Sequence, residues 1–311
     1  MTALGGSTVL VTGVAGFLGR YVAREFARLG WLVIGLDVVA EENAPPGIEY
    51  HQLTLPDPQL AKLLSETRPA ACVHCAGRAS VAHSLTDPAS DFRESTALTF
   101  DLLDTLRLHA PTCRTVLLSS AAVYGNPASL PVTENHAAAP LSPYGYHKLM
   151  GEMLAEEFHR IYHLPTAVVR IFSAYGPGLR RQVVWDICRR ALINDRLRLH
   201  GTGEESRDFI HAADVAAALA LVVQRAPFDG ERYNVATGCE TTIRALASTI
   251  IEELGRTLVP EYDGSATPGD PRNWRADISR ITELGFTPRI SLREGLKSVG
   301  SWAKAELSFV E

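Results

Sequence analysis

The sequence predicts an α/β fold in which a doubly wound parallel sheet is followed by a smaller C-terminal α/β domain. Short apolar runs rich in β-branched residues alternate with helical stretches up to about residue 171, which is the rhythm of consecutive β-α-β units. Three glycines, Gly13, Gly16 and Gly19, follow the first of these runs. Beyond about residue 178 the rhythm gives way to shorter elements and loops, as expected for a second, smaller domain.

The elements of the first domain follow from the apolar runs and from the helical stretches between them. Leu18, Val22, Phe26 and Leu29 share one helical face, and Gly30 ends that helix. We expect strands at residues 8–11, 31–36, 71–76, 115–118 and 167–171, and helices at 20–29, 58–66, 87–109 and 144–162.

The C-terminal part of the chain predicts a mixture of short strands and helices. We expect residues 1–173 to form the first domain and residues 174–311 to form mostly the second. An alanine-rich helical stretch ends near residue 224 and is suited to packing back on the first domain, so a return segment of about 206–235 is expected. The further predicted elements are helices at 183–192, 242–254 and 291–307 and a strand at 197–199.

The glycine-rich turn after the first strand predicts a dinucleotide site. Its glycines would turn the chain, let the backbone approach a pyrophosphate and let the next helix pack on the strand. Asp37 ends the second strand, where such a site needs an acceptor for the adenosine ribose hydroxyls. A carboxylate repels the extra phosphate of NADP, and no arginine follows it immediately. NAD is therefore the expected cofactor of this Rossmann-type domain.

Tyr144 and Lys148 lie one helical turn apart and project from the same helix face. Free tyrosine has a pKa of about 10 and is a poor base at neutral pH. A neighbouring ammonium stabilises the phenolate, so Lys148 is expected to lower the pKa of Tyr144. Such a tyrosine can take a proton from an alcohol while a hydride leaves the same carbon.

Composition and charge exclude several other classes of protein. The chain of 311 residues is 46% hydrophobic and 21% charged, which is typical of a globular protein. A net charge of −5 without a long basic run indicates no nucleic-acid partner. Seven residues before the first strand leave no room for a signal peptide, and the apolar runs are too short to span a bilayer, so a cytoplasmic enzyme is expected. Cys72 and Cys75 would point to opposite faces of a strand, so no metal site is expected.

Further motifs accompany these in a fixed order along the chain, at 13–19, 73–77, 119–125, 144–148, 170–178, 207–211 and 233–238, with Gly269-Asp270 and Ala276-Asp277 after them. Together they resemble the extended short-chain dehydrogenase/reductase family, and above all its nucleotide-sugar 4-epimerases of the UDP-galactose 4-epimerase type. The resemblance covers nearly the whole chain.

The resemblance implies roles for individual residues. Tyr144 is similar to the catalytic base, and Lys148 to the residue that tunes it and holds the nicotinamide ribose. Ser120 is similar to the residue that hydrogen-bonds the reacting sugar oxygen, and Arg207 to an arginine that binds the nucleotide diphosphate. The resemblance further implies cofactor contacts from Phe17, Leu18, Leu53, Cys75, Ala76, Gly77, Ser95 and Phe172, and substrate contacts from Tyr144, Ser173, Arg180, Arg272 and Trp274.

Several positions depart from the family pattern. The aspartate that the family usually places beside the adenine is absent from Gln52-Leu53, and asparagines common in the family are replaced by Ser95 and Ser173. The arginine that commonly precedes the Gly-Asp pair is replaced by Thr267, for which Arg272 is a substitute. These departures concern the sugar and diphosphate contacts rather than the fold.

Two alanines narrow the expected reaction. Dehydratases of this superfamily commonly carry an Asp-Glu pair after the catalytic serine or threonine, and related decarboxylases tend to carry an acid there. Here the positions are Ala121 and Ala122, which cannot move protons. Epimerisation or reduction of a keto-sugar remains. In the expected epimerisation, Tyr144 takes the proton of the sugar 4-hydroxyl as hydride passes to NAD, and the 4-keto sugar then accepts the hydride on its other face.

The identity of the sugar has more than one interpretation. Trp274 lies near a position where bulk limits the pocket, which favours UDP-glucose and UDP-galactose over N-acetylhexosamines. Ser173 with Arg180 seven residues later is similar to the arrangement that meets the carboxylate in UDP-glucuronate epimerases, which is the alternative. Reduction of an NDP-4-keto-deoxysugar is third.

Two further expectations concern the class of protein and its assembly. A non-catalytic dinucleotide sensor on the same fold is the alternative from another class, but such proteins typically lack the tyrosine, lysine or serine that this chain retains. The family likeness also implies a homodimer through the helices at about 88–109 and 143–162.

Overall fold

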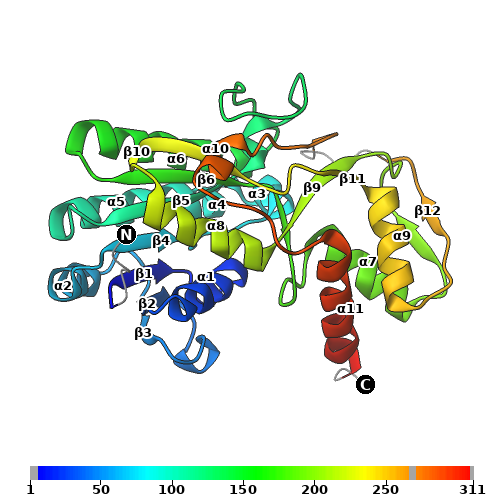
Figure 1. Cartoon of the computed structure of the whole chain (residues 1–311), viewed down its shortest axis with the longest axis horizontal. Helices are drawn as coiled ribbons and strands as arrows, with labels where there is room; N and C mark the ends of the chain where they lie inside the picture. The colour runs from blue at the N-terminus through cyan, green and yellow to red at the C-terminus, as the bar shows by residue number, and fades with distance from the viewer. Residues whose placement is uncertain (1–5, 266–270, 309–311) are drawn as a thin grey trace.

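The first domain is built on a parallel sheet, as predicted, but the sheet has seven strands where five were expected (Figure 1). The computed structural model describes residues 6–265 and 271–308. The strand order is β10-β6-β5-β4-β1-β2-β3. The direction of winding reverses between β1 and β4, and open sheets of this type bind ligands at the carboxyl ends of such strands. The strands are β1 (Thr8–Thr12), β2 (Leu32–Asp37), β3 (Glu49–Gln52), β4 (Ala71–His74), β5 (Arg114–Ser120), β6 (Thr166–Ile171) and β10 (Asp229–Val235).

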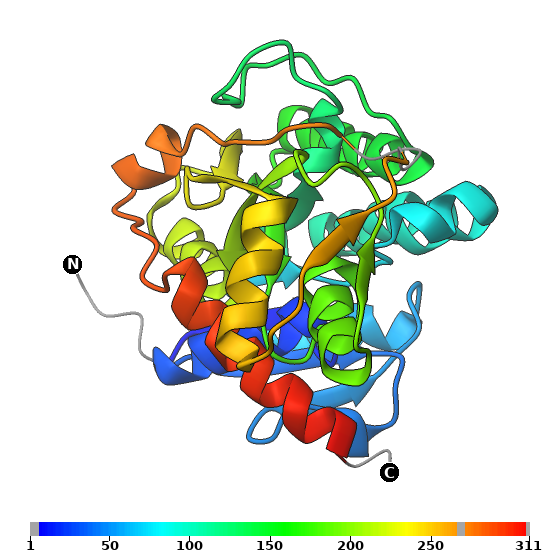
Figure 2. The ribbon, with the colours of Figure 1, turned by 90° about the vertical axis from the view of Figure 1, so that its right-hand side faces the viewer.

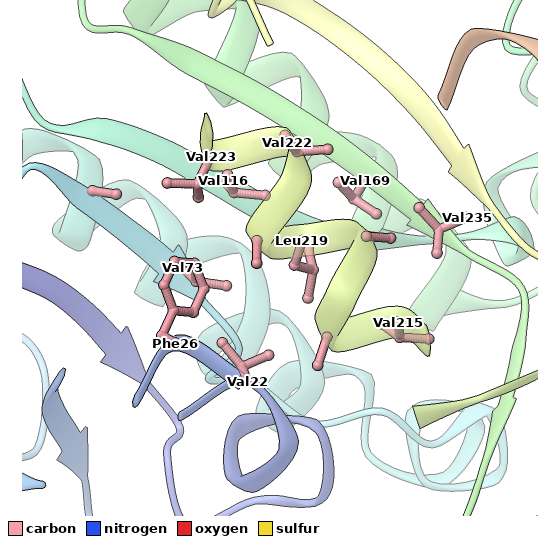
Figure 3. Close-up of a cluster of buried hydrophobic side chains, with 14 of the residues drawn as sticks. Val22, Phe26, Val73, Val116, Val169, Val215, Leu219, Val222, Val223 and Val235 are labelled. Carbon is pink, nitrogen blue, oxygen red and sulfur yellow. The ribbon is translucent and has the colours of Figure 1, made fainter. Parts of the chain in front are cut away.

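Helices cover both faces of this sheet, because the central strands are apolar on both sides. One buried cluster joins the sheet to α1 and α8, and a second joins its other face to α2, α5 and α6. Figure 3 shows Val215, Leu219 and Val222 of α8 packed against Val169 and Val235 of the sheet. The helices are α1 (Phe17–Arg28), α2 (Pro58–Thr67), α5 (Leu98–His109), α6 (Pro143–Tyr162) and α8 (Ala212–Arg225).

The single helix predicted at 87–109 is wrong in detail. The segment forms α4 (Pro88–Phe92), a π-helical turn η2 (Arg93–Ala97) and then α5, and α3 (Val81–Thr86) precedes it. The π turn brings Ser95 close to the strand end at Gly77, where an added Cβ would lie 3.1 Å from the Glu94 carbonyl oxygen. Such turns are frequent at functional sites. Apolar periodicity alone does not distinguish them from a continuous helix.

The C-terminal elements form their own buried cluster. Figures 1 and 2 show α7, α9 and α11 on one side of the molecule, with α9 and α11 packed together away from the main sheet. Two small sheets complete this part, one ordered β11-β9-β7 and the other β12-β8. Their bounds are β7 (Ser173–Tyr175), β8 (Leu197–Leu199), β9 (Ser206–His211), β11 (Glu240–Thr242) and β12 (Pro260–Tyr262), with α7 (Gln182–Ile193), α9 (Ile243–Leu254) and α11 (Leu292–Ser308). The short α10 (Ser279–Glu283) packs instead on β10 of the main sheet.

The chain passes between the two parts more than once. β9 pairs with β7 and β11, and the segment after it then supplies α8 and β10 to the main sheet. The exact domain boundary at residue 173 stays a prediction.

Among residues 6–265 and 271–308, none of the helices combines the length and apolar character needed to cross a bilayer.

Candidate active site

The predicted cofactor residues gather at the carboxyl edge of the sheet. Gly13 follows β1 with φ +65°, and an added Cβ there would lie 2.6 Å from the Ala76 backbone nitrogen. A Cβ at Gly19 would lie 2.1 Å from the Gly13 carbonyl oxygen. The glycine turn, α1 and the end of β4 therefore pack backbone to backbone, which side chains at these positions would prevent.

The beginning of α1 is suited to an anion. Gly16 caps the helix without a side chain, and no acidic residue stands in the first turn. The backbone N–H groups of Phe17 and Leu18 belong to this first turn, where helical N–H groups lack intrahelical partners. The helix dipole adds positive potential at the same place. This part of the structure fits a pyrophosphate.

Asp37 is held beside the glycine turn by two backbone donors. Its Oδ2 accepts from the Ala15 N–H at 2.9 Å and its Oδ1 from the Val38 N–H at 2.8 Å. Each carboxylate oxygen retains capacity for another hydrogen bond, so the group fits ribose hydroxyls. Leu53 lies next to this strand end and donates its N–H to the Asp37 carbonyl at 2.9 Å, while its side chain packs into the core. A cofactor contact from Leu53 stays a prediction.

The end of β4 is fixed by buried polar groups. Thr12 Oγ1 is 2.7 Å from His74 Nδ1 and accepts from the Ala76 N–H at 3.2 Å. Burial lowers the pKa of His74 to about 3, so this histidine is a neutral core residue, as its strand position indicates. Burial raises the pKa of Cys75 to about 12, which keeps the thiol protonated. The described ranges contain no group of three His, Cys, Asp or Glu side chains placed to hold a metal ion.

Ser95 lies across from this strand end, on the π turn. Its side chain is buried, and within the described part of the chain its Oγ has no hydrogen-bond partner. A Cβ added at Gly77 would lie 3.8 Å from that oxygen. A buried hydroxyl without a partner, beside an exposed glycine, fits a polar group of a bound cofactor.

The candidate catalytic residues meet where β5 ends and α6 begins. Ser142 caps α6 by accepting from the Gly145 N–H at 3.2 Å, which sets the buried Tyr144 in the first turn. Ser120 is the last residue of β5 and lies close enough to the Tyr144 hydroxyl to affect its pKa. Lys148 donates to the Leu118 carbonyl at 3.0 Å, and its Nζ is 5.9 Å from the centre of the Tyr144 ring. The structure thus brings together the predicted tyrosine, lysine and serine.

The electrostatics of Tyr144 differ from the expectation. Burial raises the pKa of Tyr144. Ser120 and the charge of Arg181 act in the opposite direction, and Asp91 raises this pKa further. The expected net lowering of the Tyr144 pKa is wrong for this structure, because burial outweighs the opposing groups. The Lys148 ammonium donates to a β5 carbonyl and lies over the Tyr144 ring, 5.9 Å from its centre. Burial also lowers the pKa of Lys148.

A second group of predicted residues lies together beside the end of β6. The Phe172 and Trp274 rings are 5.9 Å apart edge to face, and Trp274 Nε1 donates to the Gly125 carbonyl at 3.0 Å. The Arg207 guanidinium lies 5.4 Å from the centre of the Trp274 ring and donates to the Arg272 carbonyl at 3.2 Å. Ser173 follows Phe172 directly and begins β7.

Arg180 is not part of this group. Its guanidinium is 2.6 Å from a Glu306 carboxylate oxygen and 5.8 Å from the centre of the Trp302 ring, both on α11. Arg181 is the arginine whose charge reaches Tyr144. Spacing along the sequence does not distinguish two adjacent arginines: Arg181 precedes α7 in an extended conformation, whereas Arg180 is held by α11. Thr267 and Gly269-Asp270 lie outside the described residues.

Comparison with known proteins agrees with this geometry. A family model described as the NAD dependent epimerase/dehydratase family matches residues 9–236. A putative UDP-glucose 4-epimerase of Methanocaldococcus jannaschii is 30% identical over 95% of this chain and 98% of its own length. The chain therefore belongs to the NAD-dependent epimerase/dehydratase family.

Solved structures support the same family. The UDP-glucose 4-epimerase of Thermotoga maritima, with UDP-glucose, has a TM-score of 0.88 and 30% identity over 96% of this chain and 99% of that one. MoeE5 in complex with UDP-glucuronic acid and NAD has a TM-score of 0.87 and 31% identity over 96% of this chain and all of that one. The predictions of the fold, of the family and of NAD as cofactor are confirmed, and the chain is an NAD-dependent enzyme.

Proposed function

We propose that the protein is a nucleotide-sugar 4-epimerase acting on UDP-glucose and UDP-galactose. The observation that carries this proposal is the set Tyr144, Ser120 and Lys148 at the same edge of the sheet as the glycine turn, with Ser120 followed by two alanines, Ala121 and Ala122, instead of acids. This set can move one proton at one sugar oxygen and has no second acid or base immediately after Ser120 for elimination.

Each residue has a definite task in this reaction. NAD, when bound, supplies the acceptor and donor of hydride for carbon 4 of the sugar. Tyr144, as phenolate, takes the proton of the 4-hydroxyl and later returns it from the phenol formed. Ser120 hydrogen-bonds the same sugar oxygen, and Lys148, anchored on the Leu118 carbonyl, holds the nicotinamide ribose. The buried position of Tyr144 keeps bulk water away from the proton.

The group around Trp274 holds the rest of the substrate. Arg207 and Arg272 supply positive charge for the diphosphate, and a planar guanidinium suits its oxygens. Trp274 is fixed by its hydrogen bond to the Gly125 carbonyl and by packing on Phe172, so its bulk limits the sugar pocket. This arrangement favours a hexose over an N-acetylhexosamine.

UDP-glucuronate is the second candidate substrate. A guanidinium near the reacting tyrosine would compensate the sugar carboxylate, and the charge of Arg181 reaches Tyr144. MoeE5, one of the similar structures, holds UDP-glucuronic acid. Arg180 is engaged with Glu306, so Arg181 replaces it in this interpretation.

A direct assay distinguishes the candidates. Purified protein is incubated separately with UDP-glucose, UDP-glucuronate and UDP-N-acetylglucosamine, and proton NMR follows the sugar signals. We expect the 4-epimer to form from UDP-glucose without consumption of NAD. Conversion of UDP-glucuronate alone would select the second candidate. No 4-epimer from any of the three sugars, with or without added NAD, would contradict the proposed substrates.

The same proposal includes a homodimer through one helical surface. Exposed apolar side chains recur on α6 at intervals of three to eight residues, with others on α4 and α5. Patches of this kind mark protein interfaces. We call these residues the α5–α6 face: Phe92, Phe100, Leu108, Tyr146, Met150, Met153 and Ile161.

Met153→Asp tests this interface, because Met153 is 61% exposed on this face and a carboxylate there would lose its water on association. The expected result is a change from dimer to monomer in light scattering. Val259→Asp is the control, since Val259 is 83% exposed and lies outside these helices. A wild-type protein that is monomeric at micromolar concentration would contradict the proposal.

The cytoplasmic location expected from the sequence stays a prediction.

A further inference from the structure

A buried carboxylate and a histidine meet directly behind the catalytic helix. Asp91 of α4 is fully buried, and its Oδ2 lies 2.5 Å from Nδ1 of His147, which is also buried. His147 immediately precedes Lys148 in the chain and lies three residues after Tyr144. A charged group without exposure to water is rare unless it is paired, and such pairs are retained for position or chemistry.

The same segment holds His147 at two further points. Thr96 Oγ1 donates to the His147 carbonyl at 3.2 Å, and the Phe92 ring meets the imidazole edge to face at 5.5 Å. Asp91, Phe92 and Thr96 all belong to α4 and the π turn. The first turns of α6 are therefore fixed against the segment that carries Ser95, the buried hydroxyl at the cofactor edge.

The ionisable groups that surround Lys148 differ in how far neighbouring charged groups offset them. The groups around it are Tyr144 and Glu152 on α6, His74 and Cys75 at the end of β4, and Asp91 on α4. Glu152 receives two hydrogen bonds from Arg170, at 2.6 and 2.9 Å, and one from Arg232 at 3.2 Å.

Within the described part of the chain, the imidazole of His147 is the side chain that hydrogen-bonds Asp91, and the Lys148 ammonium acts on it through its charge. Among the described residues its Oδ1 has no hydrogen-bond partner, and His147 holds Oδ2. Arginines hold Glu152 on both oxygens, so its field is largely cancelled. Asp91 is therefore the buried negative charge with the least compensation near the catalytic tyrosine and lysine.

We propose that Asp91 and His147 are a positioning pair that holds the first turns of α6 and places a negative charge behind Tyr144 and Lys148. This inference rests on the catalytic roles that are proposed above for Tyr144 and Lys148. The pair acts without touching the substrate. Its effect is to favour the protonated form of Lys148 in a buried site and to disfavour the Tyr144 phenolate, so that the tyrosine readily returns the proton to the sugar oxygen.

The sign of the effect follows from the charges. A nearby carboxylate raises the pKa of a phenol and of an ammonium alike, because it disfavours phenolate and favours the protonated amine. In the structure Asp91 acts in this direction on the pKa of both Tyr144 and Lys148. Removing the Asp91 charge is therefore expected to lower the pKa of both Tyr144 and Lys148. A bell-shaped profile of activity against pH would then move toward acid pH, and not only lose height.

Asp91→Asn tests the pair on the NAD-loaded protein. Tyrosinate absorbance near 295 nm is titrated with pH in each protein and in its Y144F counterpart, so that the difference isolates Tyr144. We expect the midpoint for Tyr144 to fall by roughly 0.5 to 1 pH unit in D91N. This readout needs no substrate, so it stays interpretable even where none of the UDP sugars is converted.

Asp214→Asn is the matched control. Asp214 lies on α8 and is also buried. It accepts hydrogen bonds from the backbone N–H groups of Arg289 and Ile290, at 3.1 and 3.0 Å. D214N is expected to lower the melting temperature without moving the Tyr144 midpoint. A folded D91N whose Tyr144 midpoint equals that of the wild type would overturn the proposal, and so would an equal displacement in D214N.

If D91N does not fold, substitutions of His147 give the same test. In His147→Asn the amide nitrogen can still donate to Asp91, so the wild-type midpoint is expected. In His147→Ala the carboxylate loses the hydrogen bond that holds it behind α6, so the midpoint is expected to differ from that of the wild type. Identical midpoints in H147N and H147A would overturn the proposal.

Discussion

Replacing Tyr144 by phenylalanine is expected to lower kcat by about 10²- to 10⁴-fold, the range for loss of a positioned acid–base group. The ring is buried at the start of α6, and only the hydroxyl beside Ser120 is removed. Phenylalanine fills nearly the same volume, so folding and NAD binding are expected to persist. The measurement is turnover of the converted UDP sugar, together with the NAD content of the purified protein.

Tyr146→Phe is the control for this substitution. It makes the same chemical change two residues away, on a side chain that is 51% exposed on the outer side of α6. Its turnover is expected to stay within about twofold of the wild type, because Tyr146 lies away from the reacting atoms and phenylalanine keeps the apolar ring that it gives to the proposed α5–α6 face. Near-normal turnover by Y144F would contradict the assignment of Tyr144 as the acid–base residue. Loss of NAD from Y144F would show that the hydroxyl acts in binding instead.

The sheet and the glycine turn could be predicted because their signals are local. Buried parallel strands are short apolar runs, and the glycines stand where the backbone of β1 meets α1 and the end of β4. Tyr144 and Lys148 are likewise set by helical spacing, and α6 begins one residue before Tyr144. The strand β10 was not predicted as a separate strand, since its pairing with β6 depends on residues about 60 positions away.

The environment of the site could not be predicted from local pattern. Whether Arg180 or Arg181 acts on Tyr144 depends on tertiary packing, since Glu306 of α11 holds Arg180. Lys148 bonds a carbonyl of β5, a neighbour that only tertiary packing supplies. The pairing of Asp91 with His147 joins residues 56 positions apart, although a histidine directly before the lysine is a sequence signal that was available. The pKa values of the site residues therefore depend on which charged groups the tertiary packing brings close to them.

Gly19→Ala is expected to give the largest loss of stability and of NAD affinity among single-methyl substitutions in the glycine turn. The added Cβ would lie 2.1 Å from the Gly13 carbonyl oxygen and 2.8 Å from the Val14 Cα. Both are backbone atoms, so the clash is relieved only when α1 moves away from β1. Overpacking of this kind costs typically about 1–3 kcal/mol, and more where backbone must shift. NAD affinity should fall at least roughly tenfold, about 1.4 kcal/mol, because α1 carries the pyrophosphate site.

Gly151→Ala is the matched control, because it makes the same change in a helix that has room for it. A Cβ at Gly151 of α6 would meet only the Thr99 hydroxyl, at 4.0 Å. Alanine is favoured over glycine inside a helix by about 1 kcal/mol, so this variant is expected to melt at the wild-type temperature or above it. Calorimetry and NAD titration of both variants separate the two effects. Equal melting temperatures and equal NAD affinities for G19A and G151A would show that α1 can shift without loss, and that close packing of the glycine turn does not determine cofactor binding.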